Sequence, residues 1–190
     1  LINPKYNSGF ARATNLGIKN ASHDFILMMN QDAAFIEENS LVNLIEQLKQ
    51  LPNKTIIGCN LTDELGNFQE SVWIDDPGIK REWRFSPINQ KLHPNWKSVF
   101  EAKKQEAHKH EGYVHRINGA FLLLDKSAAK NVEEILFDED FFLYGEDVEW
   151  ALRLKKKNWK FYHYPKVTIK HLGSASSSNE NIKQQQILGS

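Results

Sequence analysis

The feature that most constrains the fold is an unbroken apolar run, FILMM at residues 25–29, which ends directly in the polar residues Asn30, Gln31 and Asp32. Such a run is typical of a strand that is covered on both faces, as in a parallel sheet flanked by helices. In open α/β sheets, ligands bind outside the carboxyl ends of the strands. We therefore expect Asp32 at the mouth of a ligand site, where a carboxylate can hold a hard cation against a phosphate. The alternative is that Asp32 only caps the turn after the strand.

Helical and extended patterns alternate around this run. A helix is expected from Asn7 or Ser8 to about residue 20, and another from Ser40 to Pro52, because apolar residues recur there at helical spacing after a capping residue. Residues 55–59 form a further short apolar strand. This alternation predicts α/β architecture with a mixed, mainly parallel sheet flanked by helices.

The regular pattern stops between residues 61 and 112 and returns after them. The stretch 61–112 is polar, carries scattered tryptophans and prolines, and is too long for a structureless loop. We expect an insertion over one face, with short strands or a helix near residues 98–109. Beyond it, the pattern predicts strands at residues 114–117, 120–124, 159–164 and 167–169, and helices at residues 127–134 and 146–158. Pro165 separates the last two strands, and His171 follows them.

Both ends of the chain carry expectations of their own. The chain opens on LINP without an initiator methionine, so we read it as the remainder of a longer protein. One domain is expected over residues 1–173. Residues 174–190 are rich in Ser, Asn and Gln, which predicts a polar tail or a terminal helix.

The charge balance and the cysteine content narrow the function classes. Lys and Arg together number 24, as do Asp and Glu, so no global field attracts nucleic acid, and we expect no nucleic-acid partner. Cys59 is the only cysteine, which excludes a disulfide framework and favours a reducing compartment. No apolar run approaches the ~20 residues of a membrane span. We expect a cytoplasmic protein that is soluble or peripheral at a membrane.

Acidic residues gather in one segment near the end of the chain. Residues 133–149 hold eight carboxylates and no Lys or Arg. Glu146 and Asp147 follow the bulky apolar residues 141–144, so we expect them beside the core, where a raised pKa lets a carboxylate accept protons as a general base. The alternative is structural, because carboxylates in the first turn of a helix are also favoured by its dipole.

His171 is the one histidine whose position indicates a metal site. It closes a predicted strand and precedes Leu172 and Gly173, so it can point into the same mouth as Asp32. A single histidine is more often structural than a ligand, and that alternative stays open. The other histidines show no ligand spacing with carboxylates.

Three blocks of the sequence resemble the inverting family 2 glycosyltransferases of the GT-A fold, and among them the bacterial branch of rhamnosyl- and galactofuranosyltransferases. Residues 7–18, NSGFARATNLGI, are similar to the family's Asn-x-Gly-Phe-Ala block. Residues 25–32 are similar to the apolar strand that ends in the family's metal-binding Asp-x-Asp. The third block begins at Gly119, continues through FDEDFFLYGEDVEW at residues 137–150 and ends at His171. The blocks keep the family's order and spacing over about two thirds of the chain.

The resemblance implies a role for each matching residue. Asp32 would bind Mg²⁺ or Mn²⁺ at the donor diphosphate, with His171 as a second protein ligand. Asp147 would be the catalytic base, and Glu146 would orient the base or the acceptor hydroxyl. The residues that would bind substrate are Asn30, Arg12, Gly119, Ala120, Arg153 and Trp150. For Arg153, an exposed helix arginine is the alternative.

The resemblance also implies a reaction. It is the transfer of a hexosyl or rhamnosyl group, with inversion, from a UDP- or dTDP-type donor to a glycan or lipid-linked acceptor, in bacterial cell-surface polysaccharide synthesis. The protein would then work in the cytoplasm or at the cytoplasmic face of the inner membrane, and the 61–112 insertion would face the acceptor.

The chain departs from the family pattern in two places. Asn30 stands where the family has the first Asp of Asp-x-Asp, and the family's nucleotide-binding first strand is expected upstream of residue 1. Two other functions therefore stay open. One is a non-catalytic carbohydrate- or nucleotide-binding remnant of such a domain, and the other is a metal-dependent phosphoesterase that uses Asp32 and His171.

Overall fold

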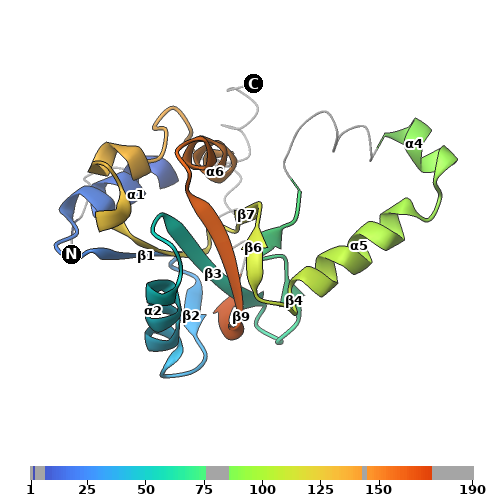
Figure 1. The fold of residues 1–190 in the computed structure, drawn as a ribbon, viewed down its shortest axis with the longest axis horizontal. Helices are drawn as coiled ribbons and strands as arrows, with labels where there is room; N and C mark the ends of the chain where they lie inside the picture. Colours follow the sequence, from blue (N-terminus) through green and yellow to red (C-terminus); the bar gives the residue numbers. More distant parts are fainter. Residues whose placement is uncertain (1, 3–6, 76–85, 143–144, 173–190) are drawn as a thin grey trace.

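The structure, a computed structural model, describes residues 2, 7–75, 86–142 and 145–172 (Figure 1). Its α-helices are α1 (Gly9–Asn20), α2 (Ser40–Gln50), α4 (Pro87–Leu92), α5 (Trp96–Ala107) and α6 (Glu146–Lys156). Its strands are β1 (Phe25–Met29), β2 (Ala33–Phe35), β3 (Thr55–Thr62), β4 (Phe68–Gln69), β5 (Val72–Trp73), β6 (Gly112–Val114), β7 (Arg116–Ile117), β8 (Phe121–Asp125) and β9 (Lys160–His171). The expected tail at residues 174–190 lies outside the described residues.

One mixed sheet organises the molecule. Its strands follow the order β1-β8-β3-β9-β2, with β4 beside β3 and β6 beside β9, while β5 and β7 form a separate two-stranded sheet. Strands β3 and β9 run parallel, and the other described pairs are antiparallel. The predicted α/β class with a mixed sheet flanked by helices is confirmed, and its parallel part is the central β3–β9 pair.

Strand β1 shows why the apolar run does not report strand direction. It pairs antiparallel with β8, from Phe25 opposite Asp125 to Met29 opposite Phe121. Ile26 and Met28 face a core cluster shared with α1 and α6, and the alternate residues of β1 pack against a second cluster shared with α2. Helices therefore cover both faces of the sheet (Figure 1). The run reflects this two-sided burial, which an antiparallel strand can also have.

The predicted helix at residues 127–134 is wrong. The segment forms two short 3₁₀ turns, Lys126–Ala128 and Val132–Ile135. Asp125 accepts a hydrogen bond from the backbone N–H of Ser127, and Asn131 accepts one from that of Glu134. Side chains that bond nearby backbone groups in this way compete with a continuous helix.

The predicted break at Pro165 is also wrong, because β9 continues through it. His163 pairs with Gly58 of β3 and Thr168 pairs with Asn60, so the ladder changes register around the proline. A proline has no N–H to donate, and it is tolerated where a bulge interrupts the ladder. The Pro165 carbonyl instead accepts from the Asn60 side chain at 3.2 Å. The unbroken strand brings His171 to the end of the sheet.

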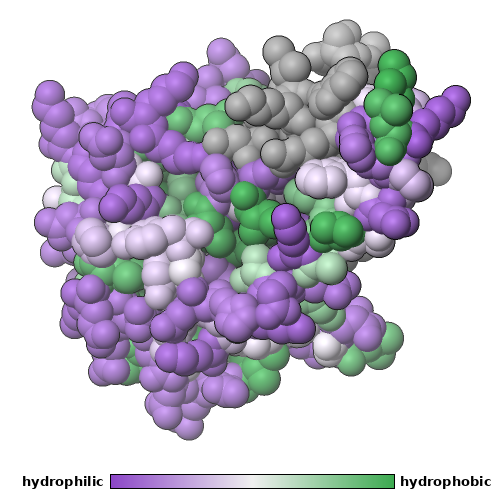
Figure 2. Space-filling view, turned by 45° about the vertical axis from the view of Figure 1, so that its right-hand side comes forward, coloured by the Kyte–Doolittle hydropathy of each residue, from purple (hydrophilic) through white to green (hydrophobic). Residues whose placement is uncertain are grey.

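Residues 61–112 hold short strands and helices, as predicted. Helices α4 and α5 project from the body in Figure 1. Strands β4 and β5, which precede them in the chain, pair with β3 and β7. His108, at the end of α5, connects this helix to the start of β5, because its Nε2 accepts from the backbone N–H groups of Ser71 and Val72. In the view of Figure 2, hydrophilic residues cover most of the surface, and several hydrophobic residues gather near the centre of the picture. Among the described residues, no helix has the length and apolarity needed to cross a bilayer.

Candidate active site

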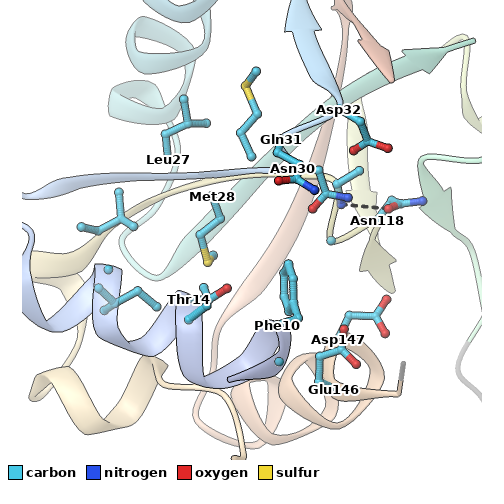
Figure 3. A pocket seen from close by; sticks show the side chains of 18 of the residues that line it. Phe10, Thr14, Leu27, Met28, Asn30, Gln31, Asp32, Asn118, Glu146 and Asp147 are labelled. Atoms are coloured by element: carbon cyan, nitrogen blue, oxygen red, sulfur yellow. Dashed lines mark hydrogen bonds between the residues drawn. The ribbon is translucent and has the colours of Figure 1, made fainter. Parts of the chain in front are cut away.

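A cleft of about 1000 Å³ lies where the carboxyl ends of β1 and β9 approach the start of α6. Figure 3 shows Asn30 and Asp32 on one side of it and Glu146 and Asp147 on the other, with Phe10 of α1 between them. Three segments that are far apart in the sequence therefore meet at one site. We call the side with Asp32 the strand end of the cleft and the side with Asp147 the helix end.

Strand pairing builds the strand end. Ala33 pairs with His171 across the β2–β9 ladder, and the backbone N–H of Leu172 donates to the Asp32 carbonyl at 2.9 Å. The Oδ1 atom of Asp32 consequently lies 3.5 Å from Nε2 of His171, and both side chains are largely buried. The Asn30 side-chain nitrogen lies 3.4 Å from the same Nε2. The structure thus places the two predicted metal ligands together, with Asn30 beside them.

A glycine, Gly145, allows the backbone turn that precedes α6 at the helix end of the cleft. Gly145 precedes α6 with φ of 89°, a left-handed conformation that glycine adopts without the strain a Cβ would cause. Glu146 and Asp147 then form the first turn of the helix and line the cleft. Gly119 also lines the cleft, so close that a Cβ added there would lie 3.7 Å from the Cβ of Asp147.

Asp147 is held by a cation that the sequence did not single out. The Arg116 Nη1 atom donates to Asp147 Oδ2 at 2.8 Å. The Arg116 guanidinium also stacks over the Trp73 ring, 3.6 Å from its centroid. Both members of the ion pair are mostly buried, at 14% and 24% exposed, so water screens the pair less than it would at the surface. Arg116 therefore fixes one oxygen of Asp147 and its direction.

Glu146 has the opposite surroundings. Its residue is 8% exposed, and its Oε2 atom has no hydrogen-bond partner among the described residues. Burial raises the pKa of the Glu146 carboxyl, and the neighbouring charge of Asp147 adds to the increase. Glu146 is thus the carboxyl at this site that bears out the expected raised pKa.

The first sequence block reaches the cleft through Gly9. This glycine has φ of 77°, and a Cβ there would lie 2.6 Å from the Phe142 carbonyl oxygen. The N–H of the next residue, Phe10, donates to the same oxygen at 3.2 Å. A glycine is needed at this position because α1 must approach the segment before α6 so closely. Residues 143–144, part of the apolar run 141–144 that was expected to hold the carboxylates near the core, lie outside the described residues.

Three predicted substrate-binding residues lie outside the cleft lining. Arg12 is half-exposed and faces Glu139, with 3.8 Å between its Nε and Glu139 Oε2. Trp150 is buried, stacks on Phe137 and donates from Nε1 to the Ile135 carbonyl. Arg153 pairs with Glu149 on its own helix and also donates to backbone carbonyls of the preceding segment. These contacts support α6 and α1 structurally, whereas Asn30, Gly119 and Ala120, the other residues predicted to bind substrate, line the cleft.

Sequence reasoning missed Arg116, Trp73 and Gln69. Trp73 and Gln69 belong to the 61–112 stretch, where their type alone gave no position, and Arg116 sits in a strand of 2 residues. A signal did exist for Trp73, because the 61–112 stretch, with its tryptophans, was expected to face the acceptor. No pattern in the sequence pointed to Arg116 or Gln69.

The fold and the site together define a class of protein. Among solved structures, the chain resembles the crystal structure of GalNAc-T7 with UDP, GalNAc and Mn²⁺, with a TM-score of 0.58 and 12% sequence identity. The match covers 90% of this chain and 31% of that chain, so this chain spans about a third of the length of that protein. The fold is therefore the GT-A glycosyltransferase fold.

The sequence places the chain more narrowly. The family described as "Glycosyltransferase like family 2" matches residues 1–186, and the chain belongs to this family. No curated protein matches the chain. The rhamnosyl- and galactofuranosyltransferase branch stays a prediction.

Proposed function

We propose that this domain transfers a sugar from a nucleoside-diphosphate sugar to a hydroxyl group of a glycan or lipid-linked acceptor. The observation that carries the proposal is the pairing of two different ends in one cleft. The strand end offers Asp32 and His171, which suit a metal-bound diphosphate, and the helix end offers Asp147, which suits a hydroxyl proton. Family membership and the GT-A fold support this division of roles.

The strand end fits a divalent metal by the chemistry of its donor atoms. One carboxylate oxygen and one imidazole nitrogen lie 3.5 Å apart and largely buried, and such a mixed oxygen and nitrogen set suits Mn²⁺ or Mg²⁺. No group of three or more His, Cys, Asp or Glu that could hold a metal occurs in the described part of the chain. Donor phosphate oxygens and water would complete the coordination. When bound, the cation supplies neutralisation of the charge on the departing diphosphate.

The helix end fits a general base. Arg116 occupies Oδ2 of Asp147, which leaves Oδ1 to accept a proton from an acceptor hydroxyl. In the proposed reaction the acceptor oxygen forms a bond to the anomeric carbon while the bond from that carbon to the phosphate oxygen breaks. The hydroxyl proton passes to Asp147, and the nucleoside diphosphate leaves. A single displacement of this kind inverts the anomeric centre.

Glu146 and the cleft walls would orient the substrates. Glu146 is buried beside Asp147, and its Oε2 atom has no hydrogen-bond partner among the described residues, so it is placed to contact the acceptor hydroxyl or the base. Asn30 at the strand end, together with Gly119 and Ala120, lines the cleft and would contact the donor sugar. We assign the acceptor side to the 61–112 insertion, since its Trp73 already lines the cleft beside Arg116.

The donor class and the cellular location extend the proposal. A UDP- or dTDP-type donor is proposed by resemblance, and the GalNAc-T7 structure, which contains UDP and Mn²⁺, supports a UDP-type nucleotide. A cytoplasmic or membrane-peripheral location at the inner membrane stays a prediction.

A thermal-shift series tests the proposed function. The protein would be melted with UDP- and dTDP-sugars, each with and without Mn²⁺, since a ligand that binds only the folded state raises the melting temperature. We expect one nucleotide class to raise it, and only with the metal. No shift with any nucleotide would contradict the proposal. A shift without release of nucleoside diphosphate in the presence of acceptors would favour the non-catalytic binding module.

A further inference from the structure

Gln69 contacts His171 twice. Its side-chain nitrogen donates to the His171 backbone carbonyl at 2.9 Å, and its side-chain oxygen lies 2.9 Å from Nδ1 of the His171 ring. Gln69 belongs to β4 and pairs with Leu61 of β3, so it reaches the strand end of the cleft from the 61–112 insertion. None of the sequence blocks that resemble the family contains it.

These two contacts determine which ring nitrogen carries the hydrogen. A carbonyl oxygen can only accept, so the NH₂ group of Gln69 must face the backbone of His171 and its oxygen must face the ring. An amide oxygen also only accepts, so Nδ1 must be the donor. In a neutral imidazole the other nitrogen, Nε2, then carries the lone pair.

The direction of that lone pair gives the tautomer a consequence. Nε2 lies 3.5 Å from Asp32 Oδ1 and 3.4 Å from the side-chain nitrogen of Asn30, which can donate to the lone pair in the metal-free protein. In this tautomer Nε2 and the Asp32 oxygen cannot hydrogen-bond each other, so a cation that displaced the Asn30 donor could be held by both. Metal-binding histidines commonly donate their second N–H to a neighbouring group, which fixes the ring and its tautomer.

The backbone around Gln69 is anchored to the same wall of the cleft. The Glu70 carbonyl accepts from the Asn118 side chain at 3.0 Å, and the Asn118 side-chain oxygen accepts from the Ala120 N–H at 2.9 Å. The backbone of Gln69 is thus held by its pairing with β3 and by the Glu70–Asn118 contact, neither of which involves His171.

We propose that Gln69 is a positioning residue that holds His171 as the Nδ1–H tautomer, so that Nε2, beside Asp32, keeps the lone pair that a divalent cation needs. The metal part rests on the proposed function. The tautomer is a property of the metal-free protein and can be tested without it. The insertion then contributes to the strand end of the cleft in addition to the acceptor side.

Nitrogen-15 NMR of the ring nitrogens of His171 tests the tautomer directly. In the metal-free protein at neutral pH we expect Nδ1 to carry the hydrogen, and a protein with the hydrogen on Nε2 would overturn the proposal. Gln69→Leu should give a mixture of tautomers. Gln69→Glu should keep Nδ1–H, because a carboxylate still accepts from it. Gln105→Leu, a glutamine exposed on α5, is the matched control and should change nothing.

Titration with Mn²⁺ alone, followed by its electron paramagnetic resonance signal, tests the consequence. We expect Gln69→Leu to weaken Mn²⁺ binding by about 10–100-fold, the usual effect of removing a partner of a metal ligand, and Gln69→Glu to restore most of it. Unchanged Mn²⁺ affinity and unchanged tautomer in Gln69→Leu would overturn the proposal. If the wild-type protein binds no Mn²⁺ while its His171 is the Nδ1–H tautomer, the metal assignment fails and the positioning of His171 by Gln69 stands.

Discussion

The two ends of the cleft are built on different principles. At the strand end, strand pairing brings Asp32 and His171 together, and Nδ1 of His171 is hydrogen-bonded to the side-chain oxygen of Gln69. At the helix end, Asp147 is in an ion pair with Arg116, while the neighbouring Glu146 keeps a buried oxygen without a partner among the described residues. The strand end presents an oxygen of Asp32 and a nitrogen of His171 that hydrogen bonds and strand pairing hold in place. The helix end combines a carboxylate in an ion pair with one whose Oε2 atom has no hydrogen-bond partner among the described residues.

The difference indicates separate tasks. A site that binds a charged group gains from ligands whose directions are fixed before binding. A site that moves a proton gains from carboxyl groups whose surroundings differ, because the environment sets which of them holds the proton. Glu146 and Asp147 are adjacent in sequence but have opposite environments, since burial favours the neutral form of Glu146 and Arg116 pairs with Asp147.

Removing the proton acceptor gives the largest expected effect. Asp147→Asn keeps the size of the side chain but cannot take a proton, so we expect the rate of sugar transfer to fall by about 10²–10⁴-fold with little loss of donor binding. Release of nucleoside diphosphate from the donor measures it. Asp140→Asn, in the exposed acidic loop, is the control and should keep full activity. An active Asp147→Asn variant would move the base elsewhere.

Removing the carboxylate at the strand end should act on binding. Loss of a residue that only hydrogen-bonds a metal ligand weakens metal binding by roughly 10–100-fold. Since Asp32 is proposed as a ligand itself, we expect Asp32→Asn to weaken Mn²⁺ binding by at least this factor. Calorimetry with Mn²⁺ measures this, with Asp24→Asn, an exposed aspartate before β1, as the control. Equal Mn²⁺ affinity in Asp32→Asn and the wild type would remove the strand end from the metal site.

The ion pair at the helix end predicts a smaller effect on rate. A hydrogen bond to a charged group is worth about 1.5–3 kcal/mol, and 1.36 kcal/mol corresponds to a tenfold change in rate. We therefore expect Arg116→Gln to lower kcat by roughly tenfold or more while KM for the donor changes little. Arg116→Lys should recover only part, because lysine lacks the planar group that stacks on Trp73. A change confined to donor KM would place Arg116 in donor binding.

Glu146 predicts the smallest effect, a gain in stability that depends on pH. Its pKa in the folded state is raised from 4.5 by burial, so its contribution to stability is fully present below pH 4.5 and is lost as the pH rises through the raised value. Glutamine cannot ionise. We expect Glu146→Gln to melt above the wild type at pH 8 and close to it at pH 4, as measured by calorimetry, while activity falls. An equal difference at both pH values would show that ionisation is not the cause.

The sequence predicted the elements that have strong local patterns. The apolar run of β1 and the helical spacing in α1, α2 and α6 each depend on residues close in the chain, and all four elements lie where expected. The antiparallel partner of β1 could not be predicted, because an apolar strand is compatible with either direction once both faces are covered. The two 3₁₀ turns after β8 were missed because Asp125 and Asn131 cap the backbone locally.

The candidate site was predictable where a residue sits at the end of a regular element. Asp32 and His171 end predicted strands, and Asp147 begins a predicted helix, so their meeting at one cleft follows from the sheet. Arg116 and Gln69 come from strands of 2 residues whose pairing depends on contacts distant in sequence. Their roles became visible only through the hydrogen bonds that they make.

Donor binding by the two single variants tests the separation of the two ends most directly. Isothermal titration of the matching nucleoside diphosphate in the presence of Mn²⁺ would be run on wild type, Asp32→Asn and Asp147→Asn. We predict that Asp147→Asn binds the nucleotide as the wild type does, although it does not transfer sugar, and that Asp32→Asn loses metal-dependent binding. Nucleotide binding that is lost in Asp147→Asn and kept in Asp32→Asn would contradict the assignment of both ends.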